Sequence, residues 1–412
     1  MSAYTGRLAC QRCNTGYDEQ AAYALCPVCR EQGVNVYPSP VYDLTGVTGL
    51  PAPHSQRGVL RFSDLLPFGT SLAGHAPQGL GEGDTPLLRL SRAGAAVGLE
   101  SLWLKDESRN PTWSYKDRLA VVAVNKALAQ GADTVVVSST GNHGAAIAAY
   151  AARLGVRCVV LTLESVPQAM KVLMQSYGAQ VAALREPAGR WAVMRDGVQQ
   201  RGWVPMSGYV NPPSGSNPFG VDGYKSIAYE LWEQFDESLP DVIVAPVAYG
   251  DGIAGLVRGF EDLIELRLTT SIPRIVAAET YGAYSEALAG RGPITDVPEP
   301  SVAFSIAALT PTWQGLNALK RSAGTAARGS NTMILEAQAA LAGGEGLYLE
   351  PSSALTYAVL PGLLARGTIS ATDRVVLLGT STGLKDVGST AATLAPVPVI
   401  EPTLASFDAA LG

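Results

Sequence analysis

Short runs of β-branched and other apolar residues alternate along the chain with longer stretches in which apolar residues recur at helical spacing. The short runs cover residues 134–137, 156–163, 242–247, 275–278 and 375–378. The helical stretches cover residues 119–129, 145–154, 168–177, 224–234, 334–341 and 354–365. Continuous apolar strands that alternate with helices are typical of a parallel sheet covered by helices. The pattern therefore predicts an α/β protein, in which ligands bind where strands lead into helices.

The length and composition limit the class of protein further. At 412 residues the chain exceeds what one hydrophobic core usually organises, so more than one domain is expected. Apolar residues make up 47% and charged residues only 16% of the chain, which excludes a disordered or coiled-coil protein. Lys and Arg number 30 against 36 Asp and Glu, without a basic run, so we expect neither nucleic acid nor a membrane surface as a partner. Because no apolar stretch is typical of a membrane span or a secretory signal, we expect a cytoplasmic protein.

The first 37 residues contain four of the five cysteines, in two pairs whose members are separated by two residues. The pairs are Cys10 with Cys13 and Cys26 with Cys29. Two such pairs can provide four thiolates to one tetrahedral ion, so residues 1–37 are predicted to form a ribbon around a structural zinc. The alternatives are two disulfides, which a reducing cytoplasm disfavours, and a ribbon without metal.

The rest of the chain divides into two parts. Residues 38–100 are rich in Pro and Gly and weakly periodic, which is typical of a connecting arm laid over a larger body. Residues 101–412 carry the α/β pattern and are predicted to form a body of two interleaved α/β domains. The smaller of these domains is expected at about 133–230.

Polar residues gather at several points where a predicted strand leads into a predicted helix. The segment 105–118 is dense in charge and contains Lys116 at a helix start, where the helix dipole favours the neutral amine that forms a Schiff base. The segment 138–144 carries hydroxyl and N–H groups that could hold a carboxylate, and hydroxyls follow another strand at 379–386. From the residues alone, a solvated helix start and a cluster of N-capping residues remain the alternatives.

A glycine-rich turn at 250–255 fits the pattern G-x-G-x-x-G and precedes Glu279 at the end of the next strand. That arrangement imitates a dinucleotide-binding motif. Its N–H groups and helix dipole could hold the phosphate of any ligand, and a dinucleotide fold normally places this turn after its first strand. We therefore interpret it as a phosphate-binding turn, with a purely structural turn as the alternative.

Taken in order, six segments resemble the threonine synthase group of fold-type II pyridoxal phosphate (PLP) enzymes, in the tryptophan synthase β-like superfamily. They are LGEGDTPL at 80–87, KDESRNPTWSYKDR at 105–118, SSTGNHG at 138–144, GDG at 250–252, EPSSA at 350–354 and GTSTGLKD at 379–386. The resemblance covers the chain from about residue 80, and the four-cysteine ribbon is similar to one in some members. It implies two parallel-sheet α/β domains with the cofactor in the cleft between them, and it argues against NAD.

The resemblance also implies roles for individual residues. Lys116 would be the catalytic lysine that forms the Schiff base with PLP. Asn142 would contact the ring hydroxyl of the cofactor, and Thr380 its pyridine nitrogen. The cofactor phosphate would be held by the backbone of Ala248, Tyr249, Gly250, Asp251, Gly252, Ile253 and Ala254. The substrate site would consist of Ser139, Thr140, Gly141, His143 and Trp113.

The implied activity is PLP-dependent elimination or replacement at Cβ or Cγ of a small amino acid. In the resembled group an arginine in a stretch like NPxRxEGxKT helps to grip the phosphate of O-phosphohomoserine, and Gly220 occupies its place here. His143 and Tyr249 also stand where threonine and asparagine are expected. We therefore expect a substrate other than O-phosphohomoserine.

Three alternative functions stay open at this point. GNHG resembles the deaminases, which would suggest a threonine or serine dehydratase or an ammonia-lyase. A true threonine synthase would need Arg109, Lys225 or Arg258 to supply the missing charge from a new direction. A catalytically silent ligand-binding homologue would keep the fold without the reaction. A homodimer is the assembly that we consider.

Overall fold

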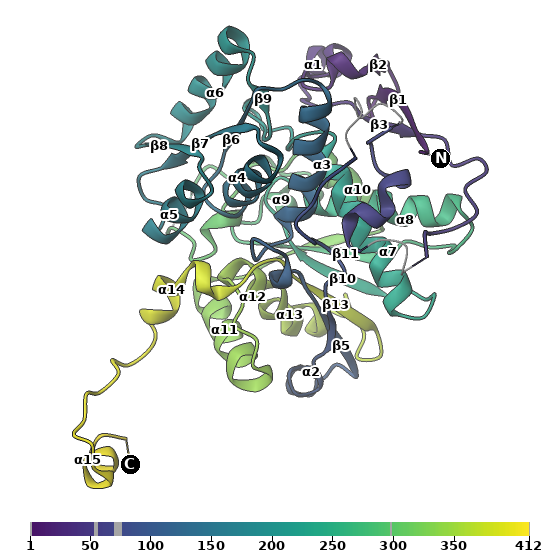
Figure 1. Ribbon diagram of the computed structural model, residues 1–412. Helices are drawn as coiled ribbons and strands as arrows, with labels where there is room; N and C mark the ends of the chain where they lie inside the picture. The colour runs from purple at the N-terminus through teal and green to yellow at the C-terminus, as the bar shows by residue number, and fades with distance from the viewer. Residues whose placement is uncertain (1, 53–56, 70–75, 297–298, 412) are drawn as a thin grey trace.

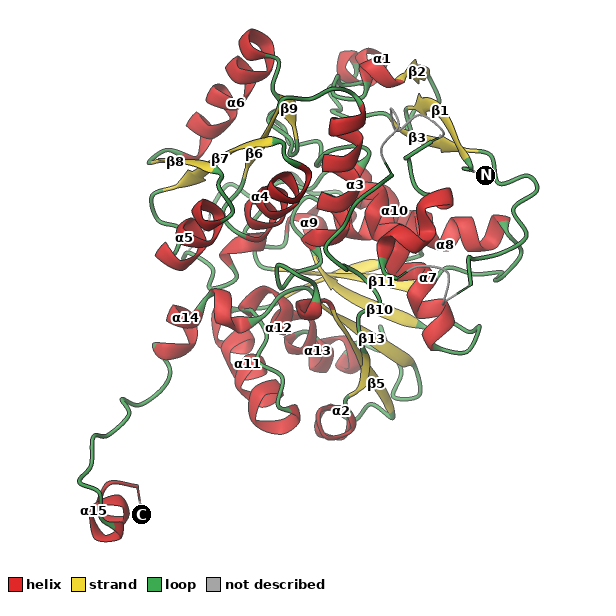
Figure 2. Ribbon diagram, in the orientation of Figure 1, coloured by secondary structure: helices red, strands yellow, loops and turns green. Residues whose placement is uncertain are grey.

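The computed structural model describes residues 2–52, 57–69, 76–296 and 299–411. Figure 1 shows two sheets at the centre of the molecule and a small third sheet near the N-terminus. The two central sheets are covered by helices on both faces, as the colours of Figure 2 show. This arrangement agrees with the α/β organisation that the hydrophobic pattern predicts.

The larger sheet has six strands in the order β12-β11-β10-β13-β5-β4. Their bounds are Thr325–Arg328, Arg274–Glu279, Val242–Pro246, Arg374–Gly379, Ser101–Asp106 and Leu87–Arg89. All neighbouring pairs are parallel except β4 and β5, which are antiparallel at the edge. Residues of β10 alternate between two hydrophobic cores, because Ile243 and Ala245 face one core while Val242 and Val244 face the other. That alternation explains why this strand is apolar at every position.

The helices around the larger sheet form two layers. One layer packs on the face that Val242 and Val244 share, and it includes α2 (Ser91–Val97), α11 (Asn331–Glu345), α12 (Pro351–Ala358) and α13 (Leu360–Ala365). The other layer includes α3 (Lys116–Ala129), α7 (Lys225–Gln234), α8 (Asp251–Glu265) and α10 (Trp313–Arg321). A further helix, α9 (Ala283–Leu288), packs against β11 and β12. The core of the second layer also contains residues of the smaller sheet, so the two sheets share one core.

The smaller sheet has four parallel strands in the order β8-β7-β6-β9. Their bounds are Gln180–Leu184, Arg157–Leu163, Thr134–Ser138 and Val204–Pro205. The helices that accompany this sheet are α4 (Asn142–Leu154), α5 (Gln168–Ser176) and α6 (Pro187–Arg201). Its strands end at residue 205, and α7 packs against α8 of the larger domain. The smaller sheet therefore occupies a shorter part of the chain than the range 133–230 expected for its domain.

The N-terminal sheet has the strand order β2-β1-β3, with bounds Gly16–Asp18, Tyr4–Ala9 and Ser39–Tyr42. The short helix α1 (Pro27–Glu31) lies between β2 and β3 in the chain. Strand β3 lies beyond residue 37, so the ribbon extends further than its sequence spacing indicates. The predicted arm 38–100 also provides β4 and α2 to the larger domain. This segment therefore belongs to both bodies that it connects, because its short strands pair with each.

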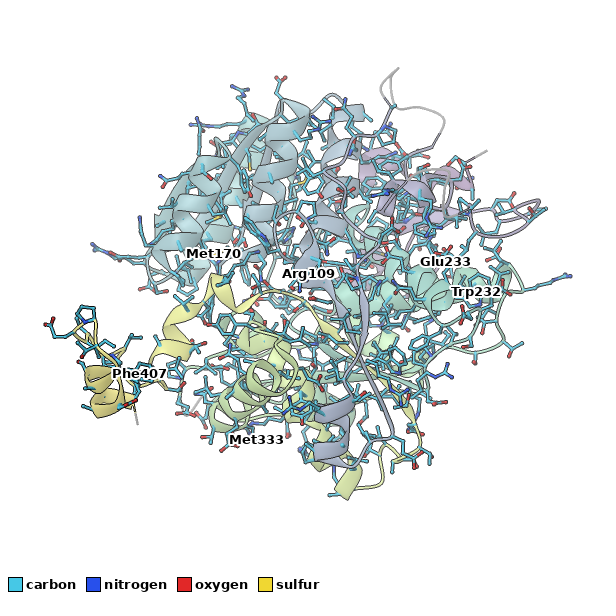
Figure 3. All side chains as sticks on the ribbon, turned by 60° about the horizontal axis from the view of Figure 1, so that its bottom comes forward. Arg109, Met170, Trp232, Glu233, Met333 and Phe407 are labelled. Carbon is cyan, nitrogen blue, oxygen red and sulfur yellow. The ribbon has the colours of Figure 1, made fainter. Side chains whose placement is uncertain are left out.

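The chain ends in α14 (Val387–Ala391) and α15 (Leu404–Leu411). Figure 1 shows α15 at the end of an extended segment that leaves the body of the molecule, and Phe407 marks it in Figure 3. Among the described helices, none has both the length and the apolar character that a membrane span requires.

Candidate active site

A cavity of about 540 Å³ lies between the two central sheets. This volume is typical of the pockets in which proteins bind small molecules. Residues of the small domain, of the larger domain and of the start of α3 line it together. The predicted site residues among them are Lys116, Ser139, Thr140, Gly141, Asn142, His143, Ala248, Tyr249, Gly250, Asp251, Gly252, Ile253 and Thr380. The structure therefore brings together in one cavity most of the residues that the resemblance singles out.

Lys116 is the first residue of α3, and its side chain lines the cavity. Its Nζ lies 3.3 Å from the hydroxyl of Tyr115, 4.6 Å from the centre of the Tyr115 ring and 5.7 Å from that of Tyr224. These two rings stack with their centroids 4.9 Å apart. No carboxylate in the described part of the chain lies within ion-pair distance of this amine. An amine without a carboxylate partner is available to form a Schiff base with a carbonyl ligand.

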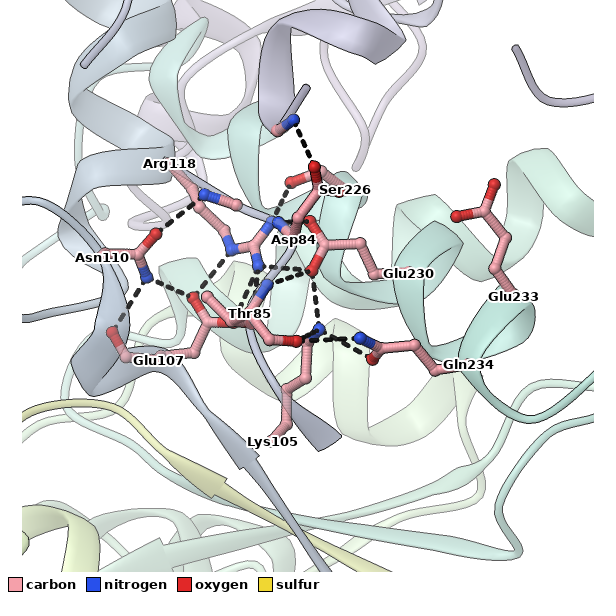
Figure 4. A network of polar contacts seen from close by, with 12 residues as sticks. Asp84, Thr85, Lys105, Glu107, Asn110, Arg118, Ser226, Glu230, Glu233 and Gln234 are labelled. Carbon is pink, nitrogen blue, oxygen red and sulfur yellow. Dashed lines mark hydrogen bonds and ion pairs between the residues drawn. The ribbon is translucent and has the colours of Figure 1, made fainter. Parts of the chain in front are cut away.

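The residues that follow Lys116 are anchored in the protein interior. Asp117 accepts hydrogen bonds from the N–H and the hydroxyl of Thr112, at 2.7 and 2.6 Å. Burial raises the pKa of Asp117 to about 7. Arg118 joins a buried cluster with the carboxylates of Glu107, which directly follows β5, and of Glu230 in α7, as Figure 4 shows. The first turn of α3 is thus fixed at the two positions after Lys116.

The cluster in Figure 4 consists of Lys105, Glu107, Arg118 and Glu230, whose side chains are all 0–2% exposed. Arg118 donates to Glu107 Oε2 at 2.7 Å and to Glu230 Oε1 at 2.6 Å, while Lys105 Nζ donates to Glu230 Oε2 at 2.6 Å. Two cations and two carboxylates balance each other. Such balance is necessary because an unpaired buried charge is strongly destabilising. The charged residues of the segment 105–118 therefore connect the start of α3 to α7 through buried ion pairs.

The glycine-rich turn predicted to bind the cofactor phosphate precedes α8 and lines the cavity. Gly250 has a left-handed backbone, with φ at 74°, and a Cβ there would lie 2.5 Å from Cα of Gly315. A Cβ on Gly252 would lie 2.9 Å from Cε2 of Tyr115. The first hydrogen bond of the helix runs from Ala254 N–H to Gly250 C=O, so the three N–H groups before it have no partner within the helix. A turn that leaves no room for side chains and presents free N–H groups fits the phosphate of PLP.

Asn142, at the start of α4, is held by two charged groups from the other domain. Its Nδ2 donates to Glu350 Oε2 at 2.7 Å, and its Oδ1 accepts from Lys385 Nζ at 2.7 Å. Burial lowers the pKa of Lys385 to about 8. Thr380 Oγ1 lies 3.0 Å from Ser353 Oγ on the same side of the site. Sequence reasoning did not assign roles to Glu350 and Lys385, although both lie in segments that carry the resemblance.

The loop after β6, predicted to hold the substrate carboxylate, lines the cavity. The hydroxyl of Ser139 accepts hydrogen bonds from the N–H groups of Gly141 and Gly144, at 3.1 and 2.9 Å, so it shapes the loop from inside. Thr140 and His143 complete this wall of the cavity. Burial, together with the nearby charge of Lys116, lowers the pKa of His143 to about 3. His143 is therefore neutral at ordinary pH, and its Nε2 has no partner in the described protein.

Two of the predicted residues, Trp113 and Ala254, are not among the residues that line the cavity, and their roles stay predictions. Trp113 is 47% exposed, and its left-handed backbone, with φ at 58°, turns the chain just before Lys116. It contributes its carbonyl, which accepts from Ser381 Oγ at 3.0 Å, rather than its ring. Ala254 lies further along α8 and lines a separate small hollow beside the ribbon. Adjacency to Lys116 or to the turn does not place either side chain in the cavity.

The four cysteines of the ribbon converge on one point. Sγ of Cys10 lies 3.5 Å from that of Cys29, and Sγ of Cys13 lies 3.5 Å from that of Cys26. All four sulfur atoms lie within 4.8 Å of one another. Tetrahedral zinc with Zn–S bonds of about 2.3 Å separates its sulfur ligands by roughly 3.8 Å. The donor set and its spacing therefore fit the predicted structural zinc.

Residues 79–381 match the family of pyridoxal-phosphate dependent enzymes. The chain belongs to this family. Threonine synthase from Methanocaldococcus jannaschii is 33% identical over 337 residues, which cover 80% of this chain and 81% of that protein. Diaminopropionate ammonia lyase from Escherichia coli has a similar structure, with a TM-score of 0.65 and 18% identity over 80% of this chain and 92% of that one. Threonine deaminase isoform 2 from Solanum lycopersicum gives a TM-score of 0.62 and 18% identity over 75% and 84% of the chains.

These comparisons confirm the predicted fold-type II architecture. The two solved structures are only 18% identical to this chain and show the fold alone. The family match and the threonine synthase relative also indicate the type of reaction. The protein is a PLP-dependent lyase of the threonine synthase type. PLP is therefore its cofactor, as predicted.

Several residues line the cavity that sequence reasoning missed, among them two large side chains of one helix. Arg190 and Trp191 reach it from α6, a helix that the hydrophobic pattern does not predict. The helix contains Gly189 and Gly197 and has few buried residues, so its apolar periodicity is weak. The signal that could have found it is the Pro at its first position and the Gly just after its end.

Proposed function

We propose that the protein catalyses elimination or replacement at Cβ or Cγ of an amino acid other than O-phosphohomoserine. The observation that carries the proposal is the cavity in which the unpaired amine of Lys116, the carboxylate loop 139–143 and the free N–H groups before Ala254 meet. An amine, a carboxylate site and a phosphate site are the three features by which a protein binds PLP together with an amino acid.

PLP supplies, when bound, an electron sink for the bond-breaking at the amino acid. Lys116 would hold the cofactor and, once the substrate amine has displaced it, take the proton from the substrate Cα. Thr380 is the group that we assign to the pyridine nitrogen. A neutral hydroxyl does not keep that nitrogen protonated as a carboxylate would, so loss of a leaving group is favoured over racemisation. The loop 139–143 would orient the substrate by its carboxylate.

The substrate proposal is supported by the surroundings of Gly220. This residue is buried, and a Cβ there would lie 2.9 Å from both Ala123 Cβ and Leu119 Cγ. No arginine side chain fits at this position without moving α3. An arginine at this position therefore cannot contribute to phosphate binding in this protein.

The three cations that could have replaced this arginine are engaged elsewhere. Lys225 is buried with an ion pair to Asp262 at 2.6 Å, and Arg258 pairs with Asp222. Arg109 is 64% exposed in its side chain and pairs with the neighbouring Asp106. None of the three lines the cavity. This favours the proposal over a true threonine synthase that uses these cations.

The test is a panel of amino acids offered to the purified yellow holoenzyme. Release of phosphate, ammonia and keto acid is measured for O-phosphohomoserine, threonine, serine and O-acylated serine and homoserine. Loss of one charge-assisted hydrogen bond of about 1.5–3 kcal/mol corresponds to roughly 10- to 150-fold in kcat/KM. We expect O-phosphohomoserine to be at least that much poorer than the best unphosphorylated substrate.

Efficient formation of threonine from O-phosphohomoserine would contradict the substrate proposal. Ammonia and keto acid from threonine or serine would identify a dehydratase. A protein that binds PLP and shifts its visible band with amino acids, but releases no product from any of them, would be a silent homologue.

A further inference from the structure

Arg190 is a cation in the wall of the cavity for which the proposed reaction has no role. It comes from α6 of the small domain, whereas the carboxylate loop follows β6 and the phosphate-binding turn precedes α8. Its Nε donates to Pro187 C=O at 3.2 Å, near the start of the same helix. Its terminal nitrogens make no hydrogen bond or ion pair with any residue that the structure describes.

Arg190 differs from the arginines in the protein interior because it has no carboxylate partner among the described residues. Arg118 and Arg258 each pair with carboxylates. Arg190 is partly buried, and burial lowers its pKa, while the nearby Tyr249 acts in the opposite direction. A guanidinium that loses water without gaining a carboxylate partner is costly for the protein alone. A ligand anion that enters the cavity would offset this cost.

The other anions expected in the cavity already have binding groups. The cofactor phosphate has the N–H groups at the start of α8, and the substrate carboxylate has the loop 139–143. Among the described residues that line the cavity, the only lysine is Lys116, which we assign to the cofactor, and the only arginine is Arg190. Arg190 is therefore the cation that is available to contact the end of the substrate side chain.

We infer that Arg190 binds a carboxylate at the end of the substrate side chain, an inference that rests on the proposed function. The planar guanidinium presents two terminal nitrogens, which match the two oxygens of a carboxylate. One remaining cation balances one negative charge, whereas a phosphate dianion would leave charge uncompensated in the cavity. Trp191 and Tyr249, which line the same cavity, provide apolar surface for the carbon chain of such a substrate.

The experiment compares acidic amino acids with their amides, which have nearly the same shape but no charge. Aspartate, glutamate and 2-aminoadipate are each titrated beside the matching amide into the holoenzyme, and the dissociation constant is read from the visible band of the cofactor. We expect at least one acid to bind about tenfold or more tightly than its amide. Arg190→Gln should remove this preference, and Arg190→Glu should favour amino acids with a distal ammonium group.

Arg195 provides the matched control, since it lies on the same helix, is exposed and does not line the cavity. Arg195→Gln should keep the preference for the acid. Equal binding of acids and amides at all three lengths would overturn the inference, as would an Arg190→Gln variant that weakens both equally or that loses PLP. These outcomes are separate from the phosphate-release assay, because efficient use of O-phosphohomoserine would contradict the proposed function whatever the acid-to-amide ratio.

Discussion

Replacing Glu230 by glutamine should destabilise the protein strongly, because it removes one of four balanced charges from the interior. The cluster beneath Lys116 contains Lys105 and Arg118 as cations and Glu107 and Glu230 as carboxylates. Their side chains are 0–2% exposed, so water cannot compensate a missing charge. Glu230→Gln would leave one buried positive charge without a partner.

The contacts of Glu230 set the expected magnitude. Its Oε2 lies 2.6 Å from Lys105 Nζ and 2.7 Å from Arg118 Nη2, and its Oε1 lies 2.6 Å from Arg118 Nη1. Burial alone would raise the pKa of Glu230, but the charges of Arg118 and Lys105 hold it well below its ordinary value. Breaking a buried pair by removing one partner typically costs about 3–5 kcal/mol. We expect a loss of that size in the free energy of unfolding.

Urea unfolding followed by tryptophan fluorescence measures the loss. Glu164→Gln is the matched control, because it makes the same change in an ion pair at the surface. Arg185, the partner, is 86% exposed in its side chain, and Glu164 is 66% exposed. Pairs of this kind contribute about 0–1 kcal/mol. Adding Lys105→Met to Glu230→Gln should restore part of the stability, because the interior is then neutral again. If Glu230→Gln lowers the free energy of unfolding no more than Glu164→Gln does, the balanced charges of the cluster do not stabilise the protein.

Two further predictions concern the cavity and the ribbon. Because the pKa of His143 is held near 3, below its ordinary value of 6.5, the folded protein takes up this proton less readily than the unfolded chain, and stability is lost as the pH falls from about 6.5 towards 3. His143→Gln should therefore lose less stability than the wild type between pH 7 and pH 5 in urea unfolding, and an identical loss in both would contradict the assignment. The ribbon should hold about one zinc per chain by metal analysis. Cys10→Ala should lower the unfolding midpoint while the folded variant keeps its kcat, and a folded variant without activity would refute a purely structural zinc.

Strands β6, β7, β10, β11 and β13 of the central sheets could be predicted because packing on both faces leaves a continuous apolar run, whereas the more exposed strands β4, β8 and β12 leave none. Strand β10 is apolar at every position since its residues alternate between two cores. Helix α6 leaves no such pattern, because it covers an outer face of the smaller sheet with few buried residues. Gly197 within it is required by packing, as a Cβ there would lie 2.0 Å from the ring of Trp203. Such a contact depends on tertiary structure and cannot be inferred from spacing.

The same distinction applies to the site. Lys116 and the turn before α8 could be found because local sequence determines the start of a helix and a glycine turn. Lys385 and Arg190 enter the site through contacts between distant segments, which a single sequence does not reveal. The exposure of the Trp113 side chain could not be predicted, because sequence adjacency to Lys116 does not fix the direction of a side chain on a left-handed backbone.

The most direct test of the central claim, that Lys116 carries PLP, is borohydride reduction of the holoenzyme followed by peptide mass mapping. We expect a single reduced cofactor adduct on the peptide that contains Lys116, and no adduct in Lys116→Ala. Lys105 and Lys225 are the natural comparisons, since each amine is buried in an ion pair and so is not available for a Schiff base. An adduct on either of them, or one that persists in Lys116→Ala, would contradict the assignment of the site.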